Sequence, residues 1–181
     1  LINMIYSSDY FGRVFYSTIG NKYPIGICGS GFIDLLAELL KYNILSKNAK
    51  LKQDFYITGE IKITQADMYQ LITSKSAIKT AQDILMKCYP VEKENLGKIY
   101  ISGGFGNFIN VKNAMKIGLI PEIEEEKVIK IGNGSLEGAR EILLCEERKK
   151  TAEEIARSVV HIKTNEVEKN FDYILAENMY F

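Results

Sequence analysis

The stretch of sequence that most constrains the fold is residues 98–121, KIYISGGFGNFINVKNAMKIGLIP. Residues 98–102 have the apolar alternation of a short strand. A glycine pair follows directly, and a helix is then predicted over residues 110–116, with Asn110 as its cap. A glycine and a proline end that helix. The stretch therefore predicts a strand, a glycine turn and a helix in succession.

The glycine pair, Gly103 and Gly104, removes two β-carbons where the chain leaves the strand. A flat ligand, such as an adenine ring with its ribose, can then lie against bare backbone. The alternative is that the two glycines only allow a tight turn, because short glycine motifs are common in unrelated proteins. The local pattern leaves both interpretations open.

A second glycine-rich segment, residues 26–31 (GICGSG), leads directly into the apolar sequence FIDLLAELLKY. Ser30 is the predicted N-cap of this helix. The helix is apolar on nearly all sides, so we expect other elements to cover it on more than one side. Its free N–H groups and dipole can hold a phosphate or ribose oxygen. The alternative is a glycine-rich cap of a tightly packed helix.

Strands and helices alternate along the first half of the chain. Residues 1–6 and 13–18 predict a hairpin with a long loop, and residues 55–63 predict a smaller hairpin around Gly59. A capping box at residues 64–67 opens a long helix that runs to Tyr89. Lys75 and Lys79 share one flank of this helix, where they either reach a nucleotide or face solvent.

The second half continues the pattern. Residues 128–131 predict another short strand, and the turn GNGS (residues 132–135) leads into a helix capped by Ser135. The predicted buried stripe of that helix is Leu136, Ala139, Ile142 and Leu143. We expect the helical stretch to break near residues 149–150. A last strand is predicted over residues 159–163 and a C-terminal helix over residues 165–178.

These elements predict an α/β fold in a single domain, residues 1–181, without repeats or linkers. Open α/β sheets bind ligands at the carboxyl ends of their strands. The glycine turns after Ile101 and Ile131 lie together at that end if their strands run parallel.

Composition excludes several classes of function. The 181 residues carry no net charge, so no overall field attracts nucleic acid or an anionic membrane, and no apolar run matches a membrane span. Cys28, Cys88 and Cys145 lack metal or disulfide spacing, and we expect buried free thiols of a cytoplasmic protein. His161 is expected to be a strand side chain. Because Leu1 lies inside an apolar pattern, we expect a piece of a longer protein.

Five motifs in one order resemble the C-terminal part of the reductive activators of corrinoid proteins: GICGSGFIDLLAELL, ITQADMYQL, KSAI, ISGGFGNFINVKNAMKIGLIP and IGNGSLEGAREILL. The resemblance implies the ribonuclease-H-like fold of the actin-like ATPase and sugar-kinase superfamily, with a mixed sheet and helices on both faces. It also implies that this chain is the C-terminal lobe, without the family's ferredoxin-like domain and phosphate-binding lobe.

The resemblance further implies a role in methyl transfer. Such activators use ATP to return an electron to Co(II) of a corrinoid protein and so restore Co(I). The implied partners are that corrinoid protein and the N-terminal lobe of the same polypeptide, and a homodimer stays open. ATP or ADP would occupy a partial site, whereas magnesium and a two-iron cluster are expected only in the full-length parent. This chain alone is therefore expected to lack ATPase activity.

Residue by residue, the resemblance places the adenosine motif at Gly103, Gly104, Phe105, Gly106 and Asn107. It places a second glycine-rich wall of the cleft at Gly29, Ser30 and Gly31. The two segments are expected to face each other across a crevice wide enough for a purine nucleoside. Cys28 lies where related dehydratase activators hold a cluster between subunits, but no partner cysteine supports that role. No contact is assigned to residues 132–135.

Two alternatives stay open. The chain can be a lobe of another actin-like ATPase or sugar-type kinase, or a non-catalytic interaction domain that kept the fold. A kinase needs a catalytic aspartate in its other half. Ferredoxin-type cysteine spacing upstream would favour the activator.

Overall fold

The computed structural model describes residues 1–8 and 14–181. The chain opens with β1 (Ile2–Ser8) and β2 (Val14–Thr18), which pair antiparallel and confirm the predicted first hairpin. Its loop, with Asp9, Gly12 and Arg13, lies outside the described residues. A parallel bridge between Ile2 and Ile27 then brings the second glycine-rich segment against β1.

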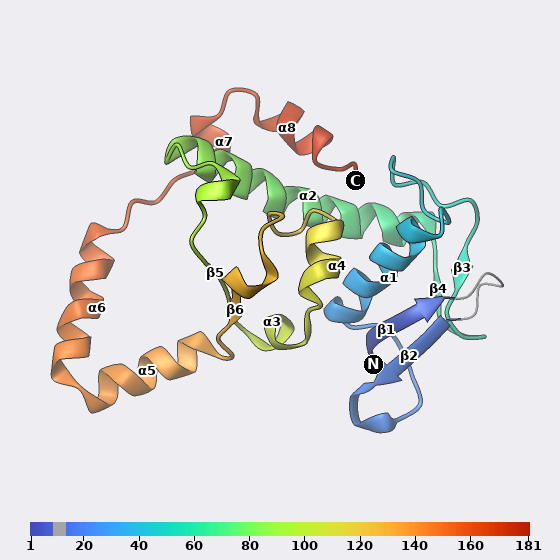
Figure 1. The fold of residues 1–181 in the computed structure, drawn as a ribbon, viewed down its shortest axis with the longest axis horizontal. Helices are drawn as coiled ribbons and strands as arrows, with labels where there is room; N and C mark the ends of the chain where they lie inside the picture. The colour runs from blue at the N-terminus through green and yellow to red at the C-terminus, as the bar shows by residue number, and fades with distance from the viewer. Residues whose placement is uncertain (9–13) are drawn as a thin grey trace.

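The apolar helix α1 (Gly29–Lys41) is buried along most of its length and lies between β1 and α4 (Val111–Lys116) (Figure 1). This confirms the expectation that it is covered on more than one side. The predicted cap at Ser30 is wrong, because α1 begins at Gly29, one residue after Cys28. The Ser30 hydroxyl instead donates to the carbonyl of Asn3 in β1 at 2.8 Å.

The middle of the chain follows the sequence pattern closely. The small hairpin is β3 (Phe55–Tyr56) and β4 (Lys62–Ile63), paired antiparallel, and α2 (Gln65–Cys88) is the long helix. The Thr64 side chain accepts from the Asp67 N–H, and Asp67 accepts from the Thr64 N–H. The capping box is therefore confirmed.

The central stretch forms β5 (Ile99–Ile101), α3 (Gly104–Phe108) and α4, and α4 is capped by Asn110 as predicted. β5 pairs parallel with β6 (Val128–Lys130). The five-residue helix α3 lies inside the glycine turn and was not predicted from the sequence. Short 3-10 turns at Ile19–Asn21, Lys93–Asn95 and Glu125–Lys127 connect these elements.

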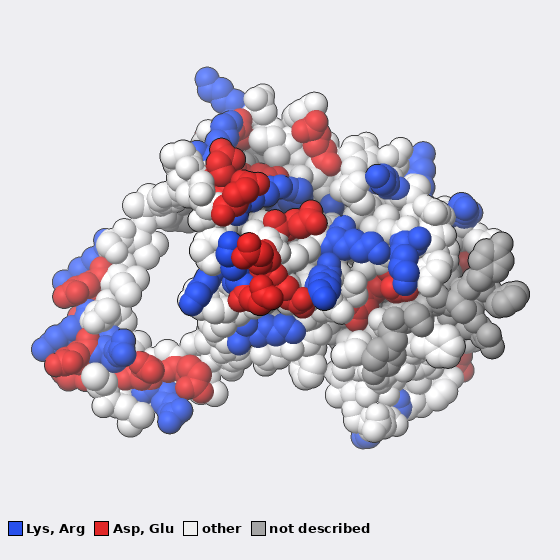
Figure 2. Space-filling view, in the orientation of Figure 1, with Lys and Arg blue, Asp and Glu red and all other residues white. Residues whose placement is uncertain are grey.

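The α/β class is confirmed, and the six described strands form three separate pairs: β1–β2, β3–β4 and β5–β6. The core gathers the apolar faces of α1, α2 and α4 with β1 and the small hairpin. Figure 2 shows that acidic and basic side chains are interspersed over the viewed face rather than gathered into a field of one sign.

Helices α5 (Gly134–Leu144) and α6 (Glu146–Ser158) form an arm that extends away from this core (Figure 1). The predicted buried stripe is wrong, because Leu136, Ala139, Ile142 and Leu143 are all exposed and Leu143 is 84% exposed. The cap of α5 is Asn133 rather than Ser135, and the helices break at Cys145 rather than near residues 149–150. An amphipathic pattern predicts a buried face only where a neighbouring element covers it.

The predicted strand over residues 159–163 is wrong. This segment connects α6 to α7 (Thr164–Val167) without pairing to any described strand, and Val159, Val160 and His161 are exposed. β-branched residues favour a strand only when a partner strand is present. The predicted C-terminal helix is divided into α7 and α8 (Phe171–Glu177), with a turn at residues 168–170.

Helices α7 and α8 lie along α2 (Figure 1) and are held there by polar side chains. The Asn178 amide donates to Thr80 at 3.1 Å and to Asp83 at 2.9 Å, and the Ser76 hydroxyl donates to the Leu175 carbonyl. Glu168 pairs with Lys87.

Lys75 also belongs to this contact, so its interpretation as a solvated lysine is wrong. Its side chain is 4% exposed, and Nζ donates to the Tyr180 carbonyl at 2.7 Å and lies 4.6 Å from the centroid of the Phe181 ring. Lys79, one turn along α2, forms an ion pair with Asp83 at 3.1 Å.

The three cysteines are free thiols, but none is buried: Cys28 and Cys145 are partly exposed and Cys88 is exposed. Within residues 1–8 and 14–181, no group of three or more His, Cys, Asp or Glu side chains converges on a point where a metal ion could sit. No helix in the same part of the chain has the length and apolar character needed to cross a membrane.

Candidate nucleoside site

The two glycine turns that follow β5 and β6 are connected by backbone hydrogen bonds. The Ile131 N–H donates to the Ile101 carbonyl at 3.0 Å, and the Gly103 N–H donates to the Gly132 carbonyl at 2.7 Å. Because the two strands are parallel, both turns lie at their carboxyl ends, as expected from the sequence.

The Ser102 hydroxyl adds a second link between the turns. It accepts from the Gly134 N–H at 3.0 Å and donates to the Gly132 carbonyl at 3.3 Å. A β-carbon on Gly134 would lie 2.8 Å from this oxygen, so Gly134 is a glycine because the Ser102 side chain occupies that space. We call this the Ser102 clasp. It gives residues 132–135 a contact that the motif alone left unassigned.

The glycines of the first turn differ in what surrounds them. Gly103 has φ = 95°, a backbone conformation that favours glycine. A β-carbon on Gly106 would lie 2.5 Å from the Ile101 side chain, so Gly106 is needed for packing. A β-carbon on Gly104 would meet no atom within 4 Å. The same holds for Gly103, so bare backbone faces open space at both positions, and of the two only Gly104 has a φ that other residues readily adopt.

A lysine from β6 binds the carbonyl groups at the C-terminal end of α3. Lys130 Nζ donates to the Ile109 carbonyl at 2.6 Å and lies 3.5 Å from the Asn107 carbonyl. Asn107 is exposed, and its backbone N–H donates to the Gly103 carbonyl at 3.3 Å. The short helix is thus held at both ends by contacts from β6 and its turn.

The second glycine-rich segment meets the first where Gly29 lies against Phe105. A β-carbon on Gly29 would lie 2.7 Å from Cε2 of Phe105, so the Phe105 ring lies directly over Gly29. The Phe105 side chain is nevertheless 48% exposed. The structure therefore brings the start of α1 and the first turn of α3 into direct contact, without a crevice between Gly29 and Phe105.

Ser30 and Gly31 face the protein interior. The buried Ser30 hydroxyl is bonded to Asn3 and lies 3.2 Å from the Cys28 sulfur. A β-carbon on Gly31 would lie 2.8 Å from the Ile2 carbonyl oxygen. Both residues fix the start of α1 against β1, so the exposed backbone of this segment is at Gly29.

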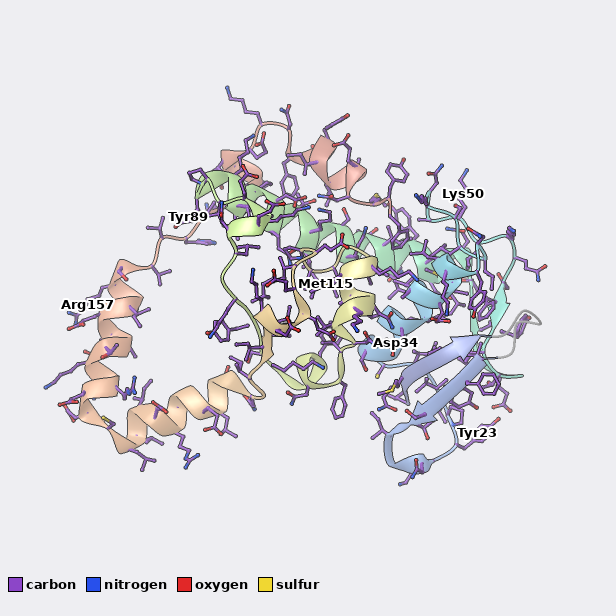
Figure 3. All side chains as sticks on the ribbon, in the orientation of Figure 1. Tyr23, Asp34, Lys50, Tyr89, Met115 and Arg157 are labelled. Atoms are coloured by element: carbon purple, nitrogen blue, oxygen red, sulfur yellow. The ribbon has the colours of Figure 1, made fainter. Side chains whose placement is uncertain are left out.

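One buried carboxylate lies behind the site and was not singled out from the sequence. Asp34 of α1 (labelled in Figure 3) accepts from the Asn113 side-chain amide at 2.7 Å and from the Ile5 N–H at 3.2 Å. Burial raises the pKa of Asp34, and the hydrogen bonds from Asn113 and Ile5 oppose that rise. The stretch FIDLLAELL holds two acidic residues, Asp34 and Glu38, among apolar ones, and this was the signal available in the sequence.

Comparison with known proteins adds to this geometry. The profile of a family described as the C-terminal domain of RACo, the ASKHA domain, matches residues 2–181. A solved structure of a reductive activator for corrinoid, iron-sulfur protein is 31% identical and superposes with a TM-score of 0.88. That match covers 99% of this chain and 32% of the other.

Two curated proteins are also similar. Corrinoid activation enzyme RamQ of Eubacterium limosum is 34% identical over 181 aligned residues, which cover 84% of this chain and 30% of that protein. The Co(II) methylated amine-specific corrinoid protein reductase of Methanosarcina barkeri is 31% identical over 152 residues, covering 81% of this chain and 28% of that protein. The chain thus spans about a third of the length of the relatives it matches.

Proposed function

Because the chain belongs to the family of C-terminal ASKHA domains of RACo, we propose that it is the nucleotide-binding lobe of an ATP-dependent reductive activator. The proposed activator returns a corrinoid protein of a methyl-transfer system from Co(II) to Co(I). One observation carries this proposal: the family match runs over residues 2–181, and the similar proteins are named for corrinoid activation or corrinoid reduction.

The proposed nucleoside surface combines the two glycine-rich segments. Gly103, Gly104, Phe105, Gly106 and Asn107 supply one wall. Gly104 is the contact position, because a β-carbon there would occupy the space that the adenine or ribose needs. The exposed ring of Phe105 offers an aromatic edge next to it.

The segment of Gly29, Ser30 and Gly31 supplies the other wall, at which Gly29 is the exposed residue. In this proposal Gly29 and the Phe105 ring close the base of the surface, while Ser30 and Gly31 hold the start of α1 against β1. A nucleoside bound at Gly104 would therefore rest on two elements that already contact each other. Such preorganised sites lose less entropy on binding.

The described residues suit a nucleoside better than they suit the magnesium ion or the two-iron cluster expected in the full-length activator. No cluster of acidic, histidine or cysteine side chains suitable for a metal is found in the described part of the chain. We therefore assign magnesium, the phosphate contacts and the two-iron cluster to other parts of the full-length protein. On this assignment the chain alone binds nucleotide weakly and does not hydrolyse ATP.

The proposed function is tested by a reduction assay with the full-length protein. The protein is mixed with a corrinoid protein in the Co(II) state, an electron donor and ATP, and Co(I) is followed by its absorption spectrum. We expect Co(I) to form with ATP and not without it. Co(I) formation that is independent of ATP, or none with any corrinoid protein of methyl transfer, would overturn the proposal.

A further inference from the structure

Asp34 is a buried acid whose hydrogen-bond partners are both neutral. Its side chain is 1% exposed, Oδ1 accepts from the Asn113 side-chain amide and Oδ2 accepts from the Ile5 N–H. A buried carboxylate with neutral partners costs folding free energy, and an apolar residue of similar size often serves stability better. The presence of Asp34 therefore requires a reason other than the stability of the core.

The two hydrogen bonds show what this carboxylate connects. Asp34 lies in α1, five residues after Gly29, and Asn113 lies in α4, directly after α3 and its glycine turn. Ile5 lies in β1, against which the start of α1 is packed. A single side chain thus connects the three elements that carry or support the two glycine-rich segments. We call the hydrogen bonds of Asp34 to Asn113 and Ile5 the tie.

The bond between Asp34 and Asn113 is also directional. Asn113 is fixed by its own backbone, because its N–H donates to the side chain of the helix cap Asn110 at 3.1 Å. The 2.7 Å contact between Asn113 Nδ2 and Asp34 Oδ1 therefore sets how far α4 lies from α1. Apolar contacts between two helices allow sliding that a short hydrogen bond to a charged group does not.

We propose that Asp34 is a positioning residue of the nucleoside site, which acts through Asn113 to fix the distance between Gly29 and the turn at Gly104. Asp34 itself touches no ligand in this proposal. The inference rests on the proposed nucleotide binding and adds the residue pair that sets the width of the site.

The chemistry of the pair offers a reciprocal test. In Asn113→Asp, two carboxyl groups face each other and repel once both are ionised, so the variants are compared at a pH of about 8, where no shared proton replaces the lost hydrogen bond. The double variant Asp34→Asn/Asn113→Asp exchanges the two groups. The amide oxygen introduced at position 34 then accepts from Ile5, and the amide nitrogen donates to the carboxylate introduced at position 113, so every hydrogen bond is restored. Leu39→Ala is the matched control, because it removes a fully buried side chain from α1 without touching the tie.

Two measurements are made on the full-length protein. The first is the dissociation constant for ADP by titration calorimetry. We expect Asn113→Asp to weaken ADP binding at least tenfold, the double variant to recover to within about threefold of wild type, and Leu39→Ala to leave affinity unchanged although it lowers the melting temperature. Unchanged affinity in Asn113→Asp, or an equal loss in Leu39→Ala, would overturn the positioning role.

The second measurement needs no ligand. Hydrogen exchange of the amides of residues 104–108 is compared among the same variants. We expect faster exchange in Asn113→Asp and normal exchange in the double variant and in Leu39→Ala. If this pattern holds while the wild-type protein binds no ADP, the proposed function fails and the tie stands as a structural device only. If exchange in Asn113→Asp equals that of wild type, the positioning proposal itself fails.

Discussion

The ring of Phe105 lies over Gly29 so closely that a β-carbon on Gly29 would be 2.7 Å from Cε2 of the ring. This contact joins residues 76 positions apart and brings the start of α1 against the glycine turn after β5. The obstacle to a larger residue at position 29 is a side chain and not backbone, so the ring can be moved or removed.

Gly29→Ala should therefore destabilise the protein through the Phe105 ring. Forcing an additional methyl group into a packed contact typically costs about 1–3 kcal/mol. In a Phe105→Ala background, the same substitution should cost only a few tenths of a kcal/mol, because the clash is gone. Urea unfolding of the two single variants and the double variant measures this coupling. Equal costs in both backgrounds would show that the Phe105 ring is not the cause of the destabilisation.

Gly104→Val tests the nucleoside surface. A β-carbon at Gly104 meets nothing within 4 Å, so folding stability should change by less than about 0.5 kcal/mol. A ligand that lies against this backbone would be displaced, and ADP affinity in the full-length protein should fall at least tenfold, about 1.4 kcal/mol.

The control for this prediction is Gly97→Val, which lies before β5 and also has open space around its α-carbon. It should change neither stability nor ADP affinity. If Gly104→Val binds ADP as tightly as Gly97→Val does, the assignment of the adenosine surface is wrong.

Ser102→Ala tests the clasp between the two glycine turns. It removes two hydrogen bonds and should cost about 1 kcal/mol of folding free energy. Gly134→Ala pushes the same hydroxyl away from the turn, so the cost of the double variant should be less than the sum of the two single costs. Ser74→Ala, which removes an exposed bond to Gln70 on α2, serves as the control. Fully additive costs would argue against a shared contact.

Much of the fold could be predicted from local sequence signals. The capping box at Thr64, the cap at Asn110 and the glycine turns are short-range patterns, and the structure has each of them. Elements whose environment is set by distant parts of the chain could not be predicted in this way. The stripe of α5 and the run at Val159 and Val160 have the patterns of buried elements, yet nothing in the described chain covers them.

The candidate site was predictable in part for the same reason. Gly103 and Gly104 follow a strand and are recognisable as a motif, and the structure brings Phe105 next to Gly29. The roles of Asp34 and Ser102 depend on partners 79 and 32 residues away, Asn113 and Gly134, and only the folded chain reveals such pairs. The sequence alone also did not distinguish Gly104, which is open, from Gly106, which is packed.

Lys75 gives a prediction on pH dependence. Burial, with a smaller contribution from the charge of Lys79, lowers the pKa of Lys75 to about 8, from an ordinary value of 10.5. Between these two values the unfolded chain holds a proton that the folded chain has released. The free energy of unfolding should therefore rise with pH across this window, by about 3 kcal/mol at most. The neutral amine can still donate to the Tyr180 carbonyl, so the contact with the C-terminal segment persists.

Other lysines and the tyrosines also titrate in this range, so the measurement is a difference between variants. Urea unfolding at pH values of about 7.5, 9 and 10 should show a rise for wild type and for Lys116→Met, which removes an exposed lysine of α4. Lys75→Met should show a smaller rise, because its apolar side chain has no proton to release. Parallel curves for Lys75→Met and Lys116→Met would mean that Lys75 has an ordinary pKa and that its amine is hydrated in the folded protein.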